Sequence, residues 1–150
     1  MAQSLSKILA LIIFSTKGRH PFLAPSARPE LHAYAATVLK TCESPALVIN
    51  SVEDHMHILC TLSKNWAVCD LIEQVKKDTS KWLKTKGGNL RKFYWQGGYG
   101  AFSVSQSQVP SVKKYIAEQE KHHRRMTFEE EFRSFLRKHE MEYDERYVWD

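Results

Sequence analysis

Two observations predict an α+β fold with a ferredoxin-like (RRM-like) antiparallel sheet and helices on one of its faces, and the chain length predicts the number of domains. The predicted elements follow the order strand, helix, strand, strand, helix, strand, with further helices at the C-terminal end. Apolar residues run almost continuously or alternate in the strands, and they recur at spacings of three and four in the helices. A chain of 150 residues can bury one core, so we expect a single domain over residues 1–150.

The first predicted strand, 7–15, is almost continuously apolar, as expected of a central strand covered on both faces. It ends in a loop with Lys17 and Arg19, whose cations could meet phosphate groups, although a solvated turn explains them equally well. A helix is predicted to begin at Ser26 and to end before Ser44 and Pro45.

Two further strands, 46–52 and 55–62, are predicted to form a hairpin. His55 and His57 lie two residues apart in the second of these strands, so their side chains project from the same face. Two imidazoles in this arrangement suit one metal ion with open coordination positions, and two packed or hydrogen-bonded histidines are the alternative. We expect both histidines on a sheet face that carries no helices.

The second predicted helix, 68–84, carries lysines on a face away from its apolar residues and leads into a basic, glycine-containing loop. A solvated helix face is the ordinary interpretation, whereas the adjoining loop suits a phosphate backbone. The aromatic stretch 93–105 predicts an edge strand, whose exposed rings could stack on unpaired bases or complete the core. The candidate DNA-binding cations are Lys17, Arg19, Lys77, Lys81, Lys84, Lys86, Arg91 and Lys92.

A third helix is predicted to start near Val109. Tyr115 and Gln119 lie four residues apart in it and should share one face. Composition alone indicates an amphipathic helix with a core tyrosine. The segment 127–130 has the pattern of a capping box and predicts the start of a last helix.

Composition limits the partners and the compartment. The 22 lysines and arginines exceed the 17 aspartates and glutamates, and the net charge of +5 favours a polyanionic partner. The three cysteines form no C-x-x-C pair, so we expect a reducing cytoplasm rather than a disulfide framework. No run approaches the roughly 20 apolar residues that a membrane helix needs, so we expect no membrane partner.

Three separated motifs carry a resemblance to a known family. Residues 54–59 contain the histidine–hydrophobic–histidine pattern, residues 95–105 form an aromatic, glycine-rich segment, and residues 115–123 begin with Tyr115. In this order they resemble the single-tyrosine HUH transposases of bacterial and archaeal insertion sequences, which move DNA as single strands. The resemblance extends over nearly the whole chain.

The resemblance implies specific roles. Tyr115 would be the nucleophile, and His55, His57 and Gln119 would bind a divalent metal ion, Mg²⁺ or Mn²⁺. The enzyme would cleave and rejoin single-stranded DNA with hairpin ends, through a 5′-phosphotyrosine at Tyr115. The resemblance also implies a homodimer in the prokaryotic cytoplasm, often with Tyr115 of one chain completing the histidine site of the other.

Two departures and two alternatives accompany this interpretation. Ala10 and Leu11 lie about where many relatives carry a histidine, and Gly97 replaces a position that is often charged. A non-catalytic (domesticated) module that binds single-stranded or hairpin nucleic acid would need the basic and aromatic residues alone. A metal-dependent nuclease would use water as its nucleophile and form no adduct. The residues name no base for Tyr115, although His122 and His123 are nearby in the sequence.

Overall fold

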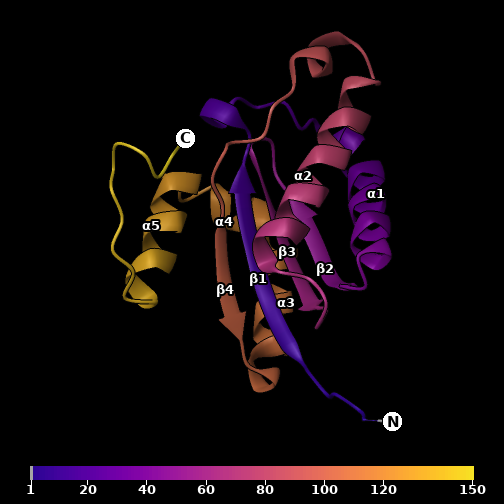
Figure 1. Cartoon of the computed structure of the whole chain (residues 1–150). Coiled ribbons are helices and arrows are strands. Elements are labelled where there is room, and N and C mark those ends of the chain that lie inside the picture. Colours follow the sequence, from indigo (N-terminus) through magenta and orange to yellow (C-terminus); the bar gives the residue numbers. More distant parts are fainter. Residues whose placement is uncertain (1) are drawn as a thin grey trace.

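A computed structural model describes residues 2–150, and its helices and strands follow the predicted order (Figure 1). The strands are β1 (Ile8–Ser15), β2 (Ala46–Ser51), β3 (His55–Leu62) and β4 (Gly100–Val104). The α-helices are α1 (Arg28–Thr41), α2 (Val68–Lys84), α3 (Val109–Ala117), α4 (Gln119–His123) and α5 (Phe128–Lys138). None of the helices within residues 2–150 combines the length and apolar composition needed to span a bilayer.

The four strands form one antiparallel sheet in the order β2-β3-β1-β4. This order is the ferredoxin-like topology predicted from the succession of elements. β1 is central, and its Ile12 pairs with Ile58 of β3 and with Ala101 of β4. β2 and β3 form the predicted hairpin. Because β3 runs antiparallel to β1, His55 at the start of β3 lies opposite Ser15 at the end of β1.

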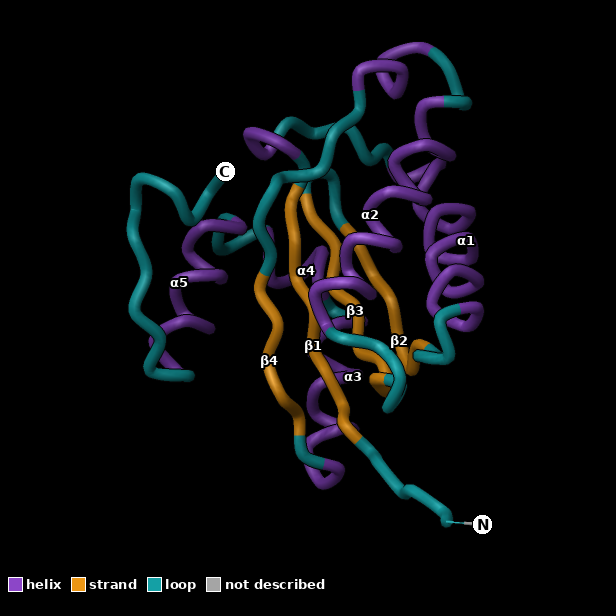
Figure 2. The backbone as a smooth tube through the Cα atoms, in the orientation of Figure 1, coloured by secondary structure: helices purple, strands orange, loops and turns teal. Residues whose placement is uncertain are grey.

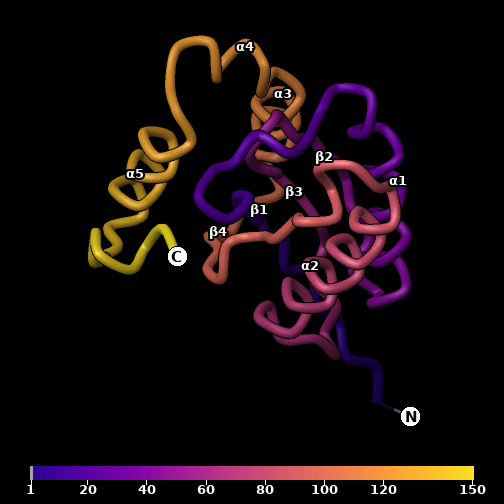
Figure 3. The backbone as a smooth tube through the Cα atoms, turned by 90° about the horizontal axis from the view of Figure 1, so that it is seen from above, coloured from indigo at the N-terminus to yellow at the C-terminus, as the bar shows by residue number. Residues whose placement is uncertain are grey.

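Helices α1 and α2 cover one face of the sheet, as predicted (Figures 1 and 3). The residues of β1 and β3 that point to this face are apolar: Ala10, Ile12, Phe14, Met56, Ile58 and Cys60. They pack against Leu31 and Leu39 of α1 and against Leu71, Ile72 and Val75 of α2. Burying this apolar surface is the main stabilising contribution on this side of the sheet.

The opposite face of the sheet is not free, so that expectation is wrong. Helices α3 and α4 lie on the side of the sheet opposite α2, and α5 lies beside β4 (Figure 3). A second core joins residues of the sheet to those of α3 and α5: Leu9, Leu11, Ile13, Phe102, Ile116, Phe128, Phe132 and Leu136. The sheet residues on this face are too apolar to remain in water, and the C-terminal helices supply the apolar stripes that cover them.

Less of the stretch 93–105 forms a strand than the sequence predicts. Figure 2 shows that the chain between α2 and β4 is mostly loop. Gly100–Val104 forms the strand that pairs with β1, and Trp95 makes an isolated bridge to Thr16. Trp95 turns into the core instead, where its Nε1 donates a hydrogen bond to Thr79 Oγ1 at 2.9 Å. Tyr94 and Tyr99 remain 57% and 39% exposed, so these are the two aromatic rings of the stretch that reach solvent.

Candidate metal and nucleophile site

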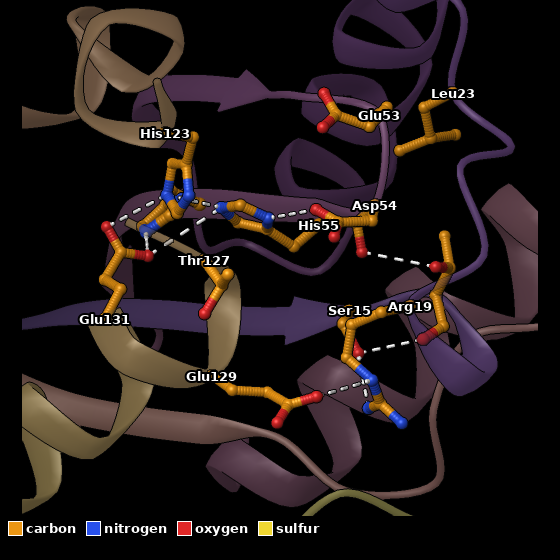
Figure 4. A network of polar contacts seen from close by, with 12 residues as sticks. Ser15, Arg19, Leu23, Glu53, Asp54, His55, His123, Thr127, Glu129 and Glu131 are labelled. Carbon is orange, nitrogen blue, oxygen red and sulfur yellow. Dashed lines mark hydrogen bonds and ion pairs between the residues drawn. The ribbon is translucent and has the colours of Figure 1, made fainter. Parts of the chain in front are cut away.

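His55 and His57 lie where the sequence predicts, on the sheet face opposite α1 and α2, and both are fully buried. Asp54 Oδ1 lies 2.6 Å from His55 Nδ1, so it fixes the ring and leaves the other nitrogen, Nε2, facing the interior (Figure 4). His55 Nε2 lies 3.0 Å from His123 Nε2 of α4. A carboxylate on the far side of an imidazole is the usual partner of a metal-binding histidine.

Glu131 of α5 lies at the centre of this group and is 1% exposed (Figure 4). Its Oε1 lies 3.0 Å from His57 Nε2 and 3.7 Å from His55 Nε2. Its Oε2 lies 3.3 Å from His123 Nε2 and accepts a hydrogen bond from the Tyr115 hydroxyl.

Glu131 is not among the site residues predicted from the sequence, although one signal for it exists. It lies on the apolar stripe of α5, three residues after Phe128 and four before Phe135. A charged residue in the core-facing stripe of an amphipathic helix needs a buried partner, and it therefore marks a candidate polar site.

Tyr115 lies beside the histidines of its own chain. Its ring centroid is 6.2 Å from that of His57, and it stacks on His122 with a centroid distance of 4.6 Å. The hydroxyl points to Glu131, as its hydrogen bond requires. The candidate nucleophile and the candidate metal-binding pair therefore meet within a single chain.

Gln119 is fully buried, but it does not share a continuous helix with Tyr115 as predicted. Helix α3 ends at Ala117, and Glu118 leaves helical geometry before α4 begins. Gln119 Nε2 donates a hydrogen bond to the Tyr115 carbonyl at 3.1 Å, so the side chain bridges the break. Its Oε1 has no hydrogen-bond partner.

Unpartnered polar atoms gather at this site. Within residues 2–150, the buried side-chain atoms without a hydrogen-bond partner are His57 Nδ1, His57 Nε2, Gln119 Oε1, His122 Nε2 and Glu131 Oε1. Buried polar atoms without partners are costly, so such a cluster suggests a missing ligand. One donor atom each from His55, His57 and Glu131 lies within 4.8 Å of the others. Two imidazoles and one carboxylate fit a divalent transition-metal ion.

The electrostatics favour the metal-binding protonation states. Burial lowers the pKa of His57 to about 4, so this imidazole is neutral at physiological pH. Burial acts to raise the pKa of Glu131, but contacts with His123 and His57 outweigh it and hold that pKa below its ordinary value. Burial and the charge of Glu131 raise the pKa of Tyr115, so the phenol keeps its proton.

The candidate DNA-binding cations occupy two regions. Lys17 and Arg19 lie in a 3-10 turn directly after β1, at the same end of the sheet as His55 (Figure 1). Arg19 already has protein partners, because its guanidinium donates to Ser15 Oγ at 3.2 Å and to the Trp149 carbonyl at 2.8 Å. Its Nε also lies 3.9 Å from Glu129 (Figure 4).

The other region comprises α2 and the segment after it. Lys77 and Lys81 are exposed on α2, and Arg91 and Lys92 are exposed in the 3-10 segment Gly88–Lys92. Lys84 and Lys86 contact aromatic rings instead of extending freely. Lys84 Nζ lies 4.0 Å from the centroid of Tyr94, and Lys86 Nζ lies 4.6 Å from that of Trp82 and 3.2 Å from Glu30.

A histidine pair on a ferredoxin-like sheet and a tyrosine on a helix beside it define a candidate site for metal-assisted chemistry. The chain belongs to the family of IS200-like transposases, whose family model matches residues 4–119. No curated protein matches the sequence.

Two solved structures have a similar fold. One is a putative transposase from Deinococcus radiodurans R1, with 17% identity over 79% of this chain and 98% of that chain, and a TM-score of 0.64. The other is a REP-associated tyrosine transposase bound to a REP hairpin, with 14% identity over 82% of this chain and 74% of that chain, and a TM-score of 0.59. At these identities the likeness confirms the fold alone.

Proposed function

We propose that this transposase cleaves and rejoins single-stranded DNA through a covalent phosphotyrosine at Tyr115. The observation that carries the proposal is the contact of the Tyr115 hydroxyl with Glu131, a carboxylate that also faces His55 and His57. A water-dependent nuclease would not need a tyrosine in this position.

His55 and His57 would hold a divalent cation, Mg²⁺ or Mn²⁺, and Gln119 and Glu131 are the candidates for a further ligand. When bound, the cation would neutralise charge on the phosphoryl oxygens of the DNA. Asp54 orients His55, and the burial of His57 keeps that imidazole neutral. The chain therefore supplies one oriented imidazole, His55, and one imidazole, His57, that needs no prior deprotonation at neutral pH.

Tyr115 would attack phosphorus in line with the departing 3′ oxygen. A bond forms between the phenolic oxygen and phosphorus, the bond from phosphorus to the 3′ oxygen breaks, and the phenolic proton is lost while the 3′ hydroxyl gains one. The ester keeps the energy of the broken bond, so a second 3′ hydroxyl can reverse the step and rejoin the DNA. Because burial and Glu131 raise the pKa of Tyr115, the phenol keeps its proton in the free chain and would lose it only in the complex with DNA.

We propose that the DNA substrate is a single strand with hairpin ends, at the ends of an insertion sequence. The net charge of +5 and the exposed cations of α2 and of the segment after it support a nucleic-acid partner. Exposed Tyr94 and Tyr99 offer faces on which unpaired bases can stack. One structure of similar fold is bound to a REP hairpin, which is consistent with this class of substrate.

A homodimer remains part of the proposal, but exchange of Tyr115 between chains is not needed to assemble the site. Tyr115 already contacts Glu131 of its own chain. Mixing His57→Ala subunits with Tyr115→Phe subunits tests the exchange. Restored strand cleavage would establish shared sites, and no recovery would favour a site built within one chain.

The test of the proposed function is adduct formation. The protein would be incubated with Mn²⁺ and with single-stranded oligonucleotides from the flanks of its own gene, then resolved on a denaturing gel. We expect a protein–DNA adduct that is absent in Tyr115→Phe. Tyr147→Phe is the matched control, because Tyr147 is 64% exposed and the substitution removes only a hydroxyl group at the surface. Cleavage without an adduct would identify a hydrolytic nuclease and overturn the proposal.

A further inference from the structure

Glu131 presents its two carboxylate oxygens to different groups. Oε1 faces the nitrogens of His57 and His55 at 3.0 and 3.7 Å, and it has no hydrogen-bond partner. Oε2 accepts the hydrogen bond of Tyr115 and lies 3.3 Å from His123. One side chain therefore touches both the candidate metal-binding pair and the candidate nucleophile.

The separation of the donor atoms already suits a shared cation. Two neighbouring ligands at about 2.1 Å from an octahedral ion lie about 3 Å from each other. His57 Nε2 and Glu131 Oε1 are 3.0 Å apart, and His55 Nε2 is 3.7 Å from the same oxygen. The carboxylate therefore needs no large movement to share an ion with both imidazoles.

Packing of α5 fixes the carboxylate in this position. Thr127 caps the helix by accepting a hydrogen bond from Glu130 N at 3.1 Å, and Phe128 packs against the ring of His55 with centroids 4.9 Å apart. Phe132 lies so close to Gly100 of β4 that a Cβ there would be 2.6 Å from the Phe132 ring. The helix that carries Glu131 is therefore held on the sheet from both sides of that residue.

We propose that Glu131 couples the metal to the nucleophile. Oε1 completes the donor set of His55 and His57, and Oε2 holds the Tyr115 hydroxyl beside the bound cation. This inference rests on the proposed function and deepens it. It also means that the third ligand comes from α5, beyond residues 4–119 that match the family model. Gln119 would then act as a structural residue at the break between α3 and α4, through its bond to the Tyr115 carbonyl.

Mn²⁺ binding tests the ligand role without any DNA. The affinity of the purified full chain would be measured from the electron paramagnetic resonance signal of free Mn²⁺, in the wild type, Glu131→Gln and Glu131→Asp. We expect Glu131→Gln to bind Mn²⁺ at least about tenfold more weakly and Glu131→Asp to recover part of the loss. Glu130→Gln is the control: it removes an exposed carboxylate from the same helix turn, and binding should not change.

Circular dichroism and thermal unfolding of the metal-free proteins would establish that Glu131→Gln, which preserves the side-chain shape, remains folded. Unchanged Mn²⁺ affinity in this folded variant would overturn the inference. Tighter binding would also overturn it, because it would mean that Glu131 competes with the cation for the histidines.

Adduct formation at saturating Mn²⁺ tests the positioning role. We expect the rate in Glu131→Gln to stay at least about tenfold below the wild type even when metal is saturating, because the tyrosine has lost its carboxylate acceptor. If the rate of adduct formation in Glu131→Gln reached that of the wild type at saturating Mn²⁺, the proposed positioning of Tyr115 by Glu131 would be wrong. If the wild-type protein itself formed no adduct, the proposed function would fail, whereas the Mn²⁺ titration would still decide whether Glu131 is a ligand.

Discussion

The two faces of the sheet are built from the same strands but differ in what they bury. Toward α1 and α2, β3 presents Met56, Ile58 and Cys60, all within an apolar core. Toward α3, α4 and α5, the same strand presents His55, His57 and Leu59. Alternation along one strand therefore separates a face that stabilises the fold from a face that also carries polar groups.

The difference between the faces has an energetic meaning. Apolar burial on the first face contributes stability directly, whereas burial of His57, Gln119 and Glu131 leaves polar atoms unpartnered. A chain selected for stability alone would favour apolar residues at these positions. The polar end of the second face is therefore best explained by a ligand that supplies the missing partners.

The largest expected effect comes from the first face. Phe14 is fully buried there, and Phe14→Ala should lower the free energy of unfolding by about 3–5 kcal/mol because it leaves a cavity. Urea denaturation checks the value. In the variant that remains folded, Mn²⁺ affinity should stay close to the wild type, since Phe14 points away from the histidines. Loss of Mn²⁺ binding without loss of stability would contradict the separation of the two faces.

On the second face, binding of a cation should raise the free energy of unfolding. Mn²⁺ at a hundred times its dissociation constant should stabilise the fold by about 2.7 kcal/mol, if it binds only the folded chain. Thermal unfolding with and without Mn²⁺ measures the shift. His57→Ala should abolish the shift, whereas His139→Ala should retain it because that exposed histidine lies outside the donor set. An equal shift in both variants would place the cation elsewhere.

The contact between β4 and α5 should link stability to metal binding. An added methyl in Gly100→Ala would clash with Phe132, and we expect a loss of about 1–3 kcal/mol together with weaker Mn²⁺ binding, since α5 carries Glu131. Urea denaturation and Mn²⁺ titration measure the two effects. Gly98→Ala is the matched control, because its nearest neighbour lies 3.7 Å from the added carbon. Weaker stability with unchanged Mn²⁺ affinity would show that the position of α5 does not matter to the site.

Two histidines of the site should make stability depend on pH in opposite directions. His57 has a pKa of about 4 in the fold and about 6.5 in the unfolded chain. Its contribution to the free energy of unfolding therefore falls as the pH drops between these values. His123 acts in the opposite direction, because its contacts with Glu131 outweigh burial and raise its pKa. Its contribution to the free energy of unfolding is therefore present at low pH and is lost as the pH rises. NMR titration of the metal-free protein should give His57 a midpoint near 4. A midpoint near 6.5 would contradict its burial.

Burial of His57 also bears on the pH dependence of activity. An ordinary histidine pKa predicts that activity falls as the pH drops through roughly 6.5. For His57 the relevant pH is near 4, because desolvation opposes its protonation. Desolvation depends on the helices packed over the sheet, so strand alternation alone could not predict it.

Local patterns predicted most of the fold. Apolar periodicity gave the bounds of α2 and β3 correctly, and parity placed His55 and His57 on one face. Tertiary packing decided the rest. The loop at 93–99 forms because Trp95 turns into the core, and the second face is covered because apolar side chains of both α3 and α5 pack against it.

The candidate site was also predictable in part: Tyr115, His55 and His57 were predicted from the sequence, and Glu131 was not. Tyr115, His55 and His57 are drawn together by the fold, although they lie on separate elements. Glu131 was missed because its partners lie far away in the sequence, even though its place among the phenylalanines of α5 is unusual for a carboxylate. The break after Ala117 could not be inferred from the four-residue spacing of Tyr115 and Gln119.

The most direct test of the central claim is the anomalous scattering of Mn²⁺ in crystals of the full chain. The claim is that the polar end of the second face binds a cation beside the tyrosine nucleophile. We predict an anomalous peak within bonding distance of His55 Nε2, His57 Nε2 and Glu131 Oε1, next to the Tyr115 hydroxyl. The absence of a peak at the histidines in Mn²⁺-soaked crystals, or a peak that excludes Glu131, would contradict this claim.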